Sequence, residues 1–197
     1  TTPELDKSEA SYYMSLVGIL RWIVELNRID IAVEVSMMAS VMALPRKGHL
    51  DQLFHMFAFL KIKHNAELVL DPSYPEINES LFERKDWTHS VYGDVEEEVI
   101  PETDPNYRKP RGKGFVIRAY VDSDHAGDSV TRRSRTGFVA LVNSEPIYWF
   151  SKKQVGIETS TFGSEFIAMK QCCEYLRGLR FKLRSMGISI EGPCCVY

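Results

Sequence analysis

Three carboxylates in the second half of the chain have the residue types and spacing to bind a divalent cation. Asp122 and Asp124 close the segment FVIRAYVDSD, and Glu165 lies further along in TSTFGSEFIAMK. Carboxylate oxygens are the ligands that Mg²⁺ and Mn²⁺ prefer. Paired ions bridged by an aspartate activate water and stabilise the leaving oxygen of a phosphodiester. The three acids are therefore candidates for one metal site, provided that a strand end and a helix bring them together.

A plainer interpretation of the same acids remains open. Asp is common in the turns that follow strands, which would account for Asp122 and Asp124. A glutamate near a helix N-terminus interacts favourably with the helix dipole, which would account for Glu165. His125 has no partner at zinc-ligand spacing, and no glycine-rich phosphate loop precedes a Lys-Ser or Lys-Thr pair.

Basic residues are concentrated around these acids although the chain carries a net charge of −3. Residues 108–153 hold ten Lys and Arg against four Asp and Glu. A basic region inside an acidic chain is typical of phosphate contact. A solvated surface explains the charge pattern equally well. The candidate nucleic-acid contacts are Arg132, Arg133, Arg135, Lys152 and Lys153.

The elements that must position these side chains can be predicted from hydrophobic periodicity. Alternating residues predict strands at 115–124, 136–143 and 146–153, joined by short turns into a three-stranded antiparallel meander. A long helix should run from the caps at 159–160 to Gly187, and a fourth strand should begin after it. The expected buried face of the helix consists of Ala168, Met169, Cys172, Leu176, Leu179, Leu183 and Met186.

The first part of the chain has helical periodicity instead. Apolar residues predict helices over 12–28, 30–44 and 49–64, the second capped by Asp30, packed as a small antiparallel bundle. A short strand is expected in AELVLDPSYPEI. The polar stretch 71–113 has acidic and basic runs and predicts a linker between a helical unit at 1–70 and a second unit at 114–197.

Other classes of protein are disfavoured. No run of about 20 apolar residues exists, and the acidic N-terminus is unlike a signal peptide, so no membrane contact is expected. The four cysteines form two adjacent pairs without C-x-x-C spacing, which predicts packed thiols in a reducing compartment. An unrelated metal phosphohydrolase would need more acids or histidines than the chain offers.

Two stretches resemble the polyproteins of copia-type retrotransposons. The Ala-Gly-Asp turn at 126–128, the Arg-Arg-Ser turn at 132–134 and the strand Trp-x-Ser-Lys-Lys-Gln at 149–154 resemble the opening of the ribonuclease H domain. The segment YYMSLVGILRWIVELNRIDIAVEVSMMASVMALP resembles the end of the reverse transcriptase, and HLDQLFHMFAFLKIKHNAELVL resembles the helix and strand that come next in the family. The resemblance covers nearly the whole chain and is weakest over 71–113.

The resemblance implies an α+β or α/β architecture: a helical bundle followed by the first part of a ribonuclease H fold. It implies Mg²⁺-dependent (or Mn²⁺-dependent) hydrolysis of RNA in an RNA–DNA hybrid, with Asp122 and Glu165 matching catalytic residues and Asp124 a second-ranked metal ligand. The implied partners are a hybrid or other nucleic acid and the remainder of the polyprotein. The implied location is the cytoplasm, or the nucleus or a virus-like particle for the intact element.

The chain also departs from that pattern. Gly163 stands where the family has an acid two residues before the catalytic glutamate, and a further metal-binding aspartate is expected just past Tyr197. The chain is therefore expected to be cut from a longer protein, to bind metal weakly and to have negligible hydrolytic activity. The alternative is a non-catalytic nucleic-acid-binding or structural remnant of a degenerate retroelement.

Overall fold

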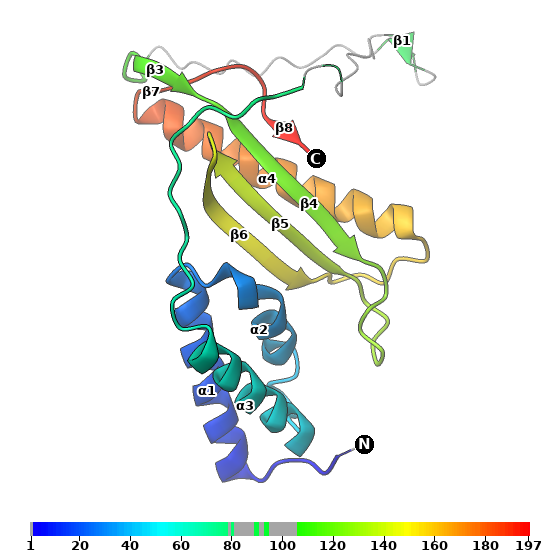
Figure 1. The fold of residues 1–197 in the computed structure, drawn as a ribbon. Helices are drawn as coiled ribbons and strands as arrows, with labels where there is room; N and C mark the ends of the chain where they lie inside the picture. The colour runs from blue at the N-terminus through cyan, green and yellow to red at the C-terminus, as the bar shows by residue number, and fades with distance from the viewer. Residues whose placement is uncertain (1, 79, 81–88, 91–92, 95–105) are drawn as a thin grey trace.

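The computed structural model describes residues 2–78, 80, 89–90, 93–94 and 106–197. The fold is mixed α+β, as the sequence predicts. Helices α1, α2 and α3 form a bundle at the bottom of Figure 1, and above it a sheet is covered on one face by α4. None of the described helices has the length and apolar character that a bilayer crossing demands.

The bundle is built from α1 (Lys7–Glu25), the short 3-10 helix η1 (Ile29–Ile31), α2 (Ala32–Ala39) and α3 (Lys47–Ile62). Helix α1 begins five residues earlier than its apolar pattern indicates, because Asp6 and Glu9 form a capping box. The bundle core consists of Tyr13, Leu16, Val17, Leu20, Val24, Ile31, Val35 and Leu53.

Two expectations in this half are wrong. Asp30 does not cap α2, because both of its carboxylate oxygens accept hydrogen bonds from Arg28 at 2.8–2.9 Å. The strand expected in AELVLDPSYPEI does not form: residues 66–70 pair with no strand that the structure describes, and Val69 is 73% exposed. Periodicity alone suggested that strand, and a strand needs a neighbour to hydrogen-bond.

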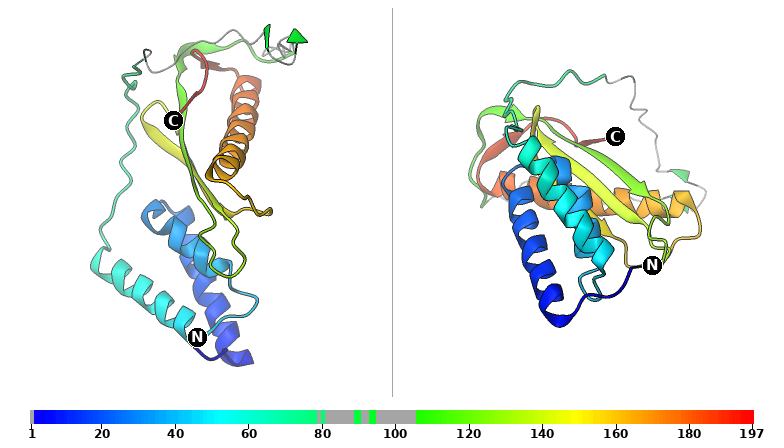
Figure 2. Two further views of the ribbon diagram at one scale, coloured as in Figure 1. Left: turned by 90° about the vertical axis from the view of Figure 1, so that its right-hand side faces the viewer. Right: turned by 60° about the horizontal axis from the view of Figure 1, so that its bottom comes forward.

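The main sheet has the order β6-β5-β4-β8. Strands β4 (Ile117–Asp124), β5 (Arg135–Val142) and β6 (Glu145–Lys153) form the expected antiparallel meander. Strand β8 (Cys195–Val196) lies parallel to β4 on its other side. The chain reaches β8 through α4 (Thr161–Ser185), a crossover helix packed on one face of the sheet, as Figure 2 shows edge-on.

A second, smaller pairing lies at the far end of the molecule. The expected strand at 115–124 is broken at Val116, so that β3 (Arg111–Phe115) leaves the main sheet and pairs in parallel with β7 (Ile188–Ile190). A further short pair joins β1 (His89–Ser90) to β2 (Gly93–Asp94). The linker expected over 71–113 falls partly outside the described residues, so the division into 1–70 and 114–197 remains a prediction.

The buried face of α4 is narrower than its pattern indicates. Ala168 is buried, Cys172 and Leu176 pack against Ile117, Ala119 and Phe138 of the sheet, and burial raises the pKa of the Cys172 thiol to about 11. Met169 is 46% exposed and Met186 is 62% exposed, so both were wrongly assigned to the core. Met169 follows the buried Ala168, where periodicity cannot separate the core from its margin, and Met186 is the C-cap residue, just beyond α4.

Candidate functional site

Asp122 and Asp124 lie at the carboxyl end of β4, on the face of the strand turned away from α4. Residues of β4 alternate, with Ile117 and Ala119 buried under the helix while both aspartates are exposed. In the antiparallel register Asp122 is opposite Gly137, so no side chain crowds its carboxylate from the neighbouring strand. The strand end therefore presents two accessible acids.

The carboxylate of Asp124 is turned back over the following turn. A Cβ atom built on Gly127 would overlap Asp124 Oδ2, so the carboxylate occupies the space of a side chain at that position. Asp124 is also opposite Arg135. Burial lowers the pKa of the Arg135 guanidinium, and the negative charges of Asp124 and Asp128 act in the opposite direction. Asp124 thus interacts with the turn and with Arg135.

Glu165 lies in the first turns of α4. Ser160 caps the helix as expected, with its side chain accepting a hydrogen bond of 3.1 Å from the Gly163 amide. Ser164 is fully buried against the sheet, and Glu165, the next residue, is exposed. Glu165 therefore lies at the edge of the helix surface that packs on the sheet.

A buried polar network fixes the start of α4 to the strand ends. The Gln154 side-chain amide donates to the Ser164 carbonyl at 3.0 Å and to Thr136 Oγ1 at 3.1 Å. Ser164 Oγ donates to the Thr161 carbonyl at 2.8 Å and lies 3.2 Å from His125 Nδ1. Because that hydroxyl has one proton, His125 Nδ1 must carry the proton in this pair. The network joins β5, the residue that follows β6, α4 and the turn after β4.

The described residues do not form a complete metal cage. No group of three or more His, Cys, Asp or Glu side chains gathers anywhere in the part of the chain that the structure describes. The donor types at Asp122, Asp124 and Glu165 suit a hard cation, but their number and the orientation of Asp124 do not. They remain candidate ligands, and no catalytic step can be derived from their present geometry.

The candidate phosphate contacts divide into engaged and exposed side chains. Lys153 forms an ion pair of 2.7 Å with Asp128, and this pairing, with help from the Thr131 amide, holds the pKa of the Asp128 carboxyl well below its usual range. Arg135 donates to Ser36 Oγ of α2. Arg132, at φ +55°, and Lys152 are exposed, while Arg133 is half-buried. Arg132 and Lys152 are therefore the most accessible.

Sequence reasoning missed the residues that support this site. Gln154 and Ser164 carry no charge and stood out only as parts of longer motifs. Glu158 is a further addition: its Oε2 atom would lie 2.7 Å from a Cβ atom on Gly163, so its carboxylate covers that glycine. An acid just before a helix cap is a recognisable signal, because it complements the helix dipole.

The curated proteins that the chain resembles include polyproteins of plant retrotransposons. The chain is 23% identical over 190 residues to the retrovirus-related Pol polyprotein from transposon RE1 of Arabidopsis thaliana. The matched residues cover 96% of this chain and 10% of that protein. It is 30% identical over 87 residues to the RE2 polyprotein of the same plant, covering 44% of this chain and 6% of that protein. It is 31% identical over 77 residues to the TNT 1-94 polyprotein of Nicotiana tabacum, and the match covers 39% of this chain and 6% of that protein.

The chain is thus homologous to Pol polyproteins of plant retrotransposons, and because TNT 1-94 is of the copia type, the resemblance expected from the sequence is confirmed. It spans a tenth or less of the length of these relatives. No protein-family model and no solved structure matches the chain.

Proposed function

We propose that the chain is the segment of a retrotransposon Pol polyprotein that joins the end of the reverse transcriptase to the first part of its ribonuclease H domain. The observation that carries this proposal is the sheet order β6-β5-β4-β8, in which a meander is followed by a crossover helix and a strand parallel to β4. That order supports a ribonuclease H-like fold. In its full form the protein would copy RNA into DNA and hydrolyse the RNA of RNA–DNA hybrids, in the cytoplasm, the nucleus or a virus-like particle.

Within that function Asp122 and Glu165 act as the catalytic carboxylates and Asp124 as an additional acid. A bound Mg²⁺ or Mn²⁺ ion would supply the Lewis acidity that activates water. Other residues of the chain position these carboxylates. Ser160 caps the helix that carries Glu165, and Gln154 hydrogen-bonds that helix to the meander. Arg132, Arg133 and Lys152 would contact the backbone of the hybrid.

A second candidate function is a non-catalytic remnant that binds nucleic acid. Two observations favour it: no three-acid group forms among the described residues, and Gly163 stands where a family acid is expected. The two functions agree that this chain by itself hydrolyses hybrids negligibly. They differ in whether Asp122 and Glu165 still share a cation.

Paramagnetic broadening of NMR signals by Mn²⁺ tests the proposal, because it detects even weak metal binding and shows which residues lie near the ion. In a ¹H–¹⁵N spectrum of the chain we expect the amides of Asp122, Asp124 and Glu165 to broaden first as Mn²⁺ is added. Asp122→Asn should abolish that order. The matched control Glu174→Gln removes an exposed acid of α4 that pairs with Lys170, and it should change nothing at β4.

Two results would contradict the proposal. One is broadening that begins elsewhere, for instance at Glu174, and is indifferent to Asp122→Asn. The other is measurable turnover of a labelled hybrid by this chain that survives Glu165→Gln, because hydrolysis would then depend on other residues. Equal broadening across all exposed acids would favour the remnant.

A further inference from the structure

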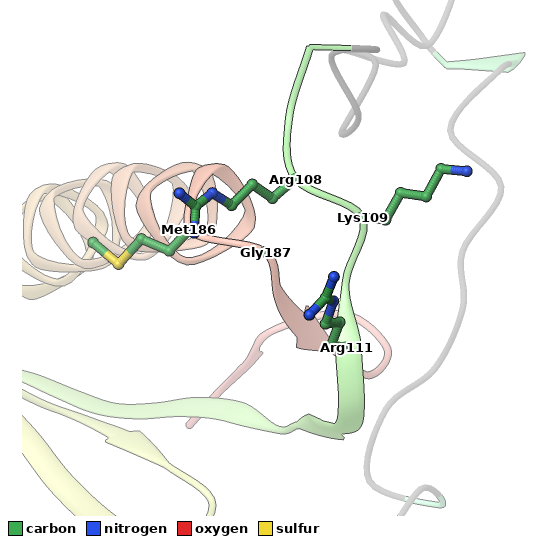
Figure 3. A pocket seen from close by; sticks show the side chains of 5 residues that line it. All are labelled: Arg108, Lys109, Arg111, Met186 and Gly187. Atoms are coloured by element: carbon green, nitrogen blue, oxygen red, sulfur yellow. The ribbon is translucent and has the colours of Figure 1, made fainter.

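A hollow of about 450 Å³ lies at the end of the molecule opposite the candidate acids. The described residues that line it come from the segment that leads into β3 and from the end of α4; they are Arg108, Lys109, Arg111, Met186 and Gly187. Three of these five described residues are cations. Figure 3 shows Arg108 lying over the end of α4 and Arg111 directed at the same turn, while Lys109 points away.

The backbone that presents these cations is held in place. The Arg111 amide donates to the Gly187 carbonyl at 3.2 Å, and Arg111 is in register with Ile188 in the parallel β3–β7 pair. Gly187 has φ +79°, and a Cβ atom there would lie 3.0 Å from Arg108 Cβ, so the close approach of the two segments requires glycine. Pro110 further restricts the backbone between Lys109 and Arg111.

The cations at the hollow have no acidic partner within the described part of the chain. Among those residues, no carboxylate forms an ion pair with Arg108, Lys109 or Arg111. Glu191, which lies just after β7, packs instead against Gly114 at the other end of β3. Clustered cations on an ordered backbone repel one another, and the negative charge of a bound polyanion relieves that repulsion. Binding also releases the counterions condensed on the polyanion, which favours the complex.

We propose that this hollow binds the phosphodiester backbone of a nucleic-acid duplex, as a contact separate from the candidate acids. The inference rests on the proposed function for the identity of the polymer, an RNA–DNA hybrid. Strand β4 separates the hollow from Asp124 and is about 26 Å long at about 3.3 Å per residue. That length corresponds to about eight base pairs of a duplex at about 3.4 Å each.

Cations near a helix C-terminus also stabilise the helix dipole, which provides an alternative role for Arg108. Binding and stability measurements separate the two. We compare binding of a fluorescent hybrid of about 20 base pairs, long enough to span β4, at about 50 and 200 mM salt. The variants are R108Q/R111Q and the charge-preserving R108K/R111K. The matched control is Lys61→Gln, which removes an exposed cation from the last turn of α3.

The slope of the logarithm of the binding constant against the logarithm of the salt concentration should become shallower by about 1.8 when two phosphate contacts are lost. Between the two salt concentrations, the factor by which affinity falls should therefore be about ten times smaller for R108Q/R111Q than for the wild type. R108K/R111K and Lys61→Gln should keep the wild-type slope. The amide of Gly187 should shift on addition of hybrid in the wild type and not in R108Q/R111Q. A thermal melt shows that each variant is folded.

An unchanged slope in R108Q/R111Q, or a fall in melting temperature as its only effect, would overturn the proposal. A shift of the Gly187 amide by inorganic phosphate with no binding of the hybrid would also overturn it, since the hollow would then be a small-anion site. R132Q/R133Q tests the proposed function separately. If that variant keeps the wild-type slope and R108Q/R111Q does not, the contact near the acids fails and this inference stands.

Discussion

Asp128 shows how a single side chain redirects a predicted contact. Its Oδ1 atom accepts hydrogen bonds from the Val130 and Thr131 amides, at 3.0 and 2.8 Å, and its Oδ2 atom accepts from Lys153 at 2.7 Å. Both partners of the ion pair are only about one-fifth exposed. Lys153, whose contact with phosphate remains a prediction, therefore stabilises the turn between β4 and β5.

Asp128→Asn should lower the free energy of unfolding by about 1 kcal/mol at pH 7, because it removes a partly screened charge pair and keeps the turn acceptor. The folded-state pKa of Asp128 lies below the ordinary Asp value of about 3.9, so this stability is fully present above that value. It is lost as pH falls through the lower, folded-state pKa. Urea unfolding should therefore show a difference between variant and wild type that is constant down to about pH 5 and shrinks towards pH 3. A constant difference at every pH would show that the charge is not responsible.

At the scale of the element, α4 depends on contacts beyond its own sequence. Its N-terminus is capped locally by Ser160, but its position over the sheet is set by Gln154, which is 2% exposed. The Gln154 amide group satisfies two oxygens that are otherwise remote from solvent. Loss of that group leaves the buried Thr136 hydroxyl without its donor, which costs more than the bond itself contributes.

Gln154→Leu should therefore lower the free energy of unfolding by about 1–3 kcal/mol. Hydrogen exchange should accelerate most in the first turns of α4. The control is Gln52→Leu, at an exposed position of α3, which should remain within about 0.5 kcal/mol of the wild type. Equal effects of the two substitutions would show that the network contributes nothing specific.

Much of the second half was predictable because its signals are local. The alternation of β5 and the Ser160 and Gly187 boundaries of α4 depend on residues a few positions apart. The first half was less predictable: Arg28 competes for Asp30, and residues 66–70 have no neighbouring strand among the described residues. At the site, types and spacing suggested the candidate acids and cations, whose roles remain predictions. They could not show that Lys153 is paired or that Gln154 orders the helix, since these partners meet only in three dimensions.

At the scale of the whole molecule, the described residues form two hydrophobic cores that are joined through β6. Trp149 belongs to the sheet, yet it packs against the core of the bundle. Beside it Ser36 Oγ donates to the Ser151 carbonyl at 2.6 Å and accepts from Arg135. Among the described residues, the Trp149 indole and this hydrogen-bond cluster therefore help to couple the helical unit to the sheet.

Trp149→Ala should weaken that coupling. We expect the free energy of unfolding of the bundle to fall by about 2 kcal/mol, which is less than truncation of a fully buried tryptophan would cost. The free energy of unfolding of the sheet should fall by a smaller amount. Helices α1 and α2 should then exchange amide protons faster than β4 and β5, and calorimetry should resolve two transitions. Phe54→Ala, at a position 47% exposed on α3, is the control. A single cooperative transition in Trp149→Ala would show that the two cores are coupled by other contacts.

The pairing of β4 with β8 has a consequence for synthesis on the ribosome. Arg118 of β4 is in register with Cys195 of β8, and every residue of α4 lies between them in the chain. Translation at about 5–20 residues per second leaves that side of β4 without its partner for roughly 4–15 s. During this interval an open strand edge beside Ile117 and Ala119 can pair with other chains. The nascent protein is therefore expected to need chaperone protection between the emergence of β4 and that of β8.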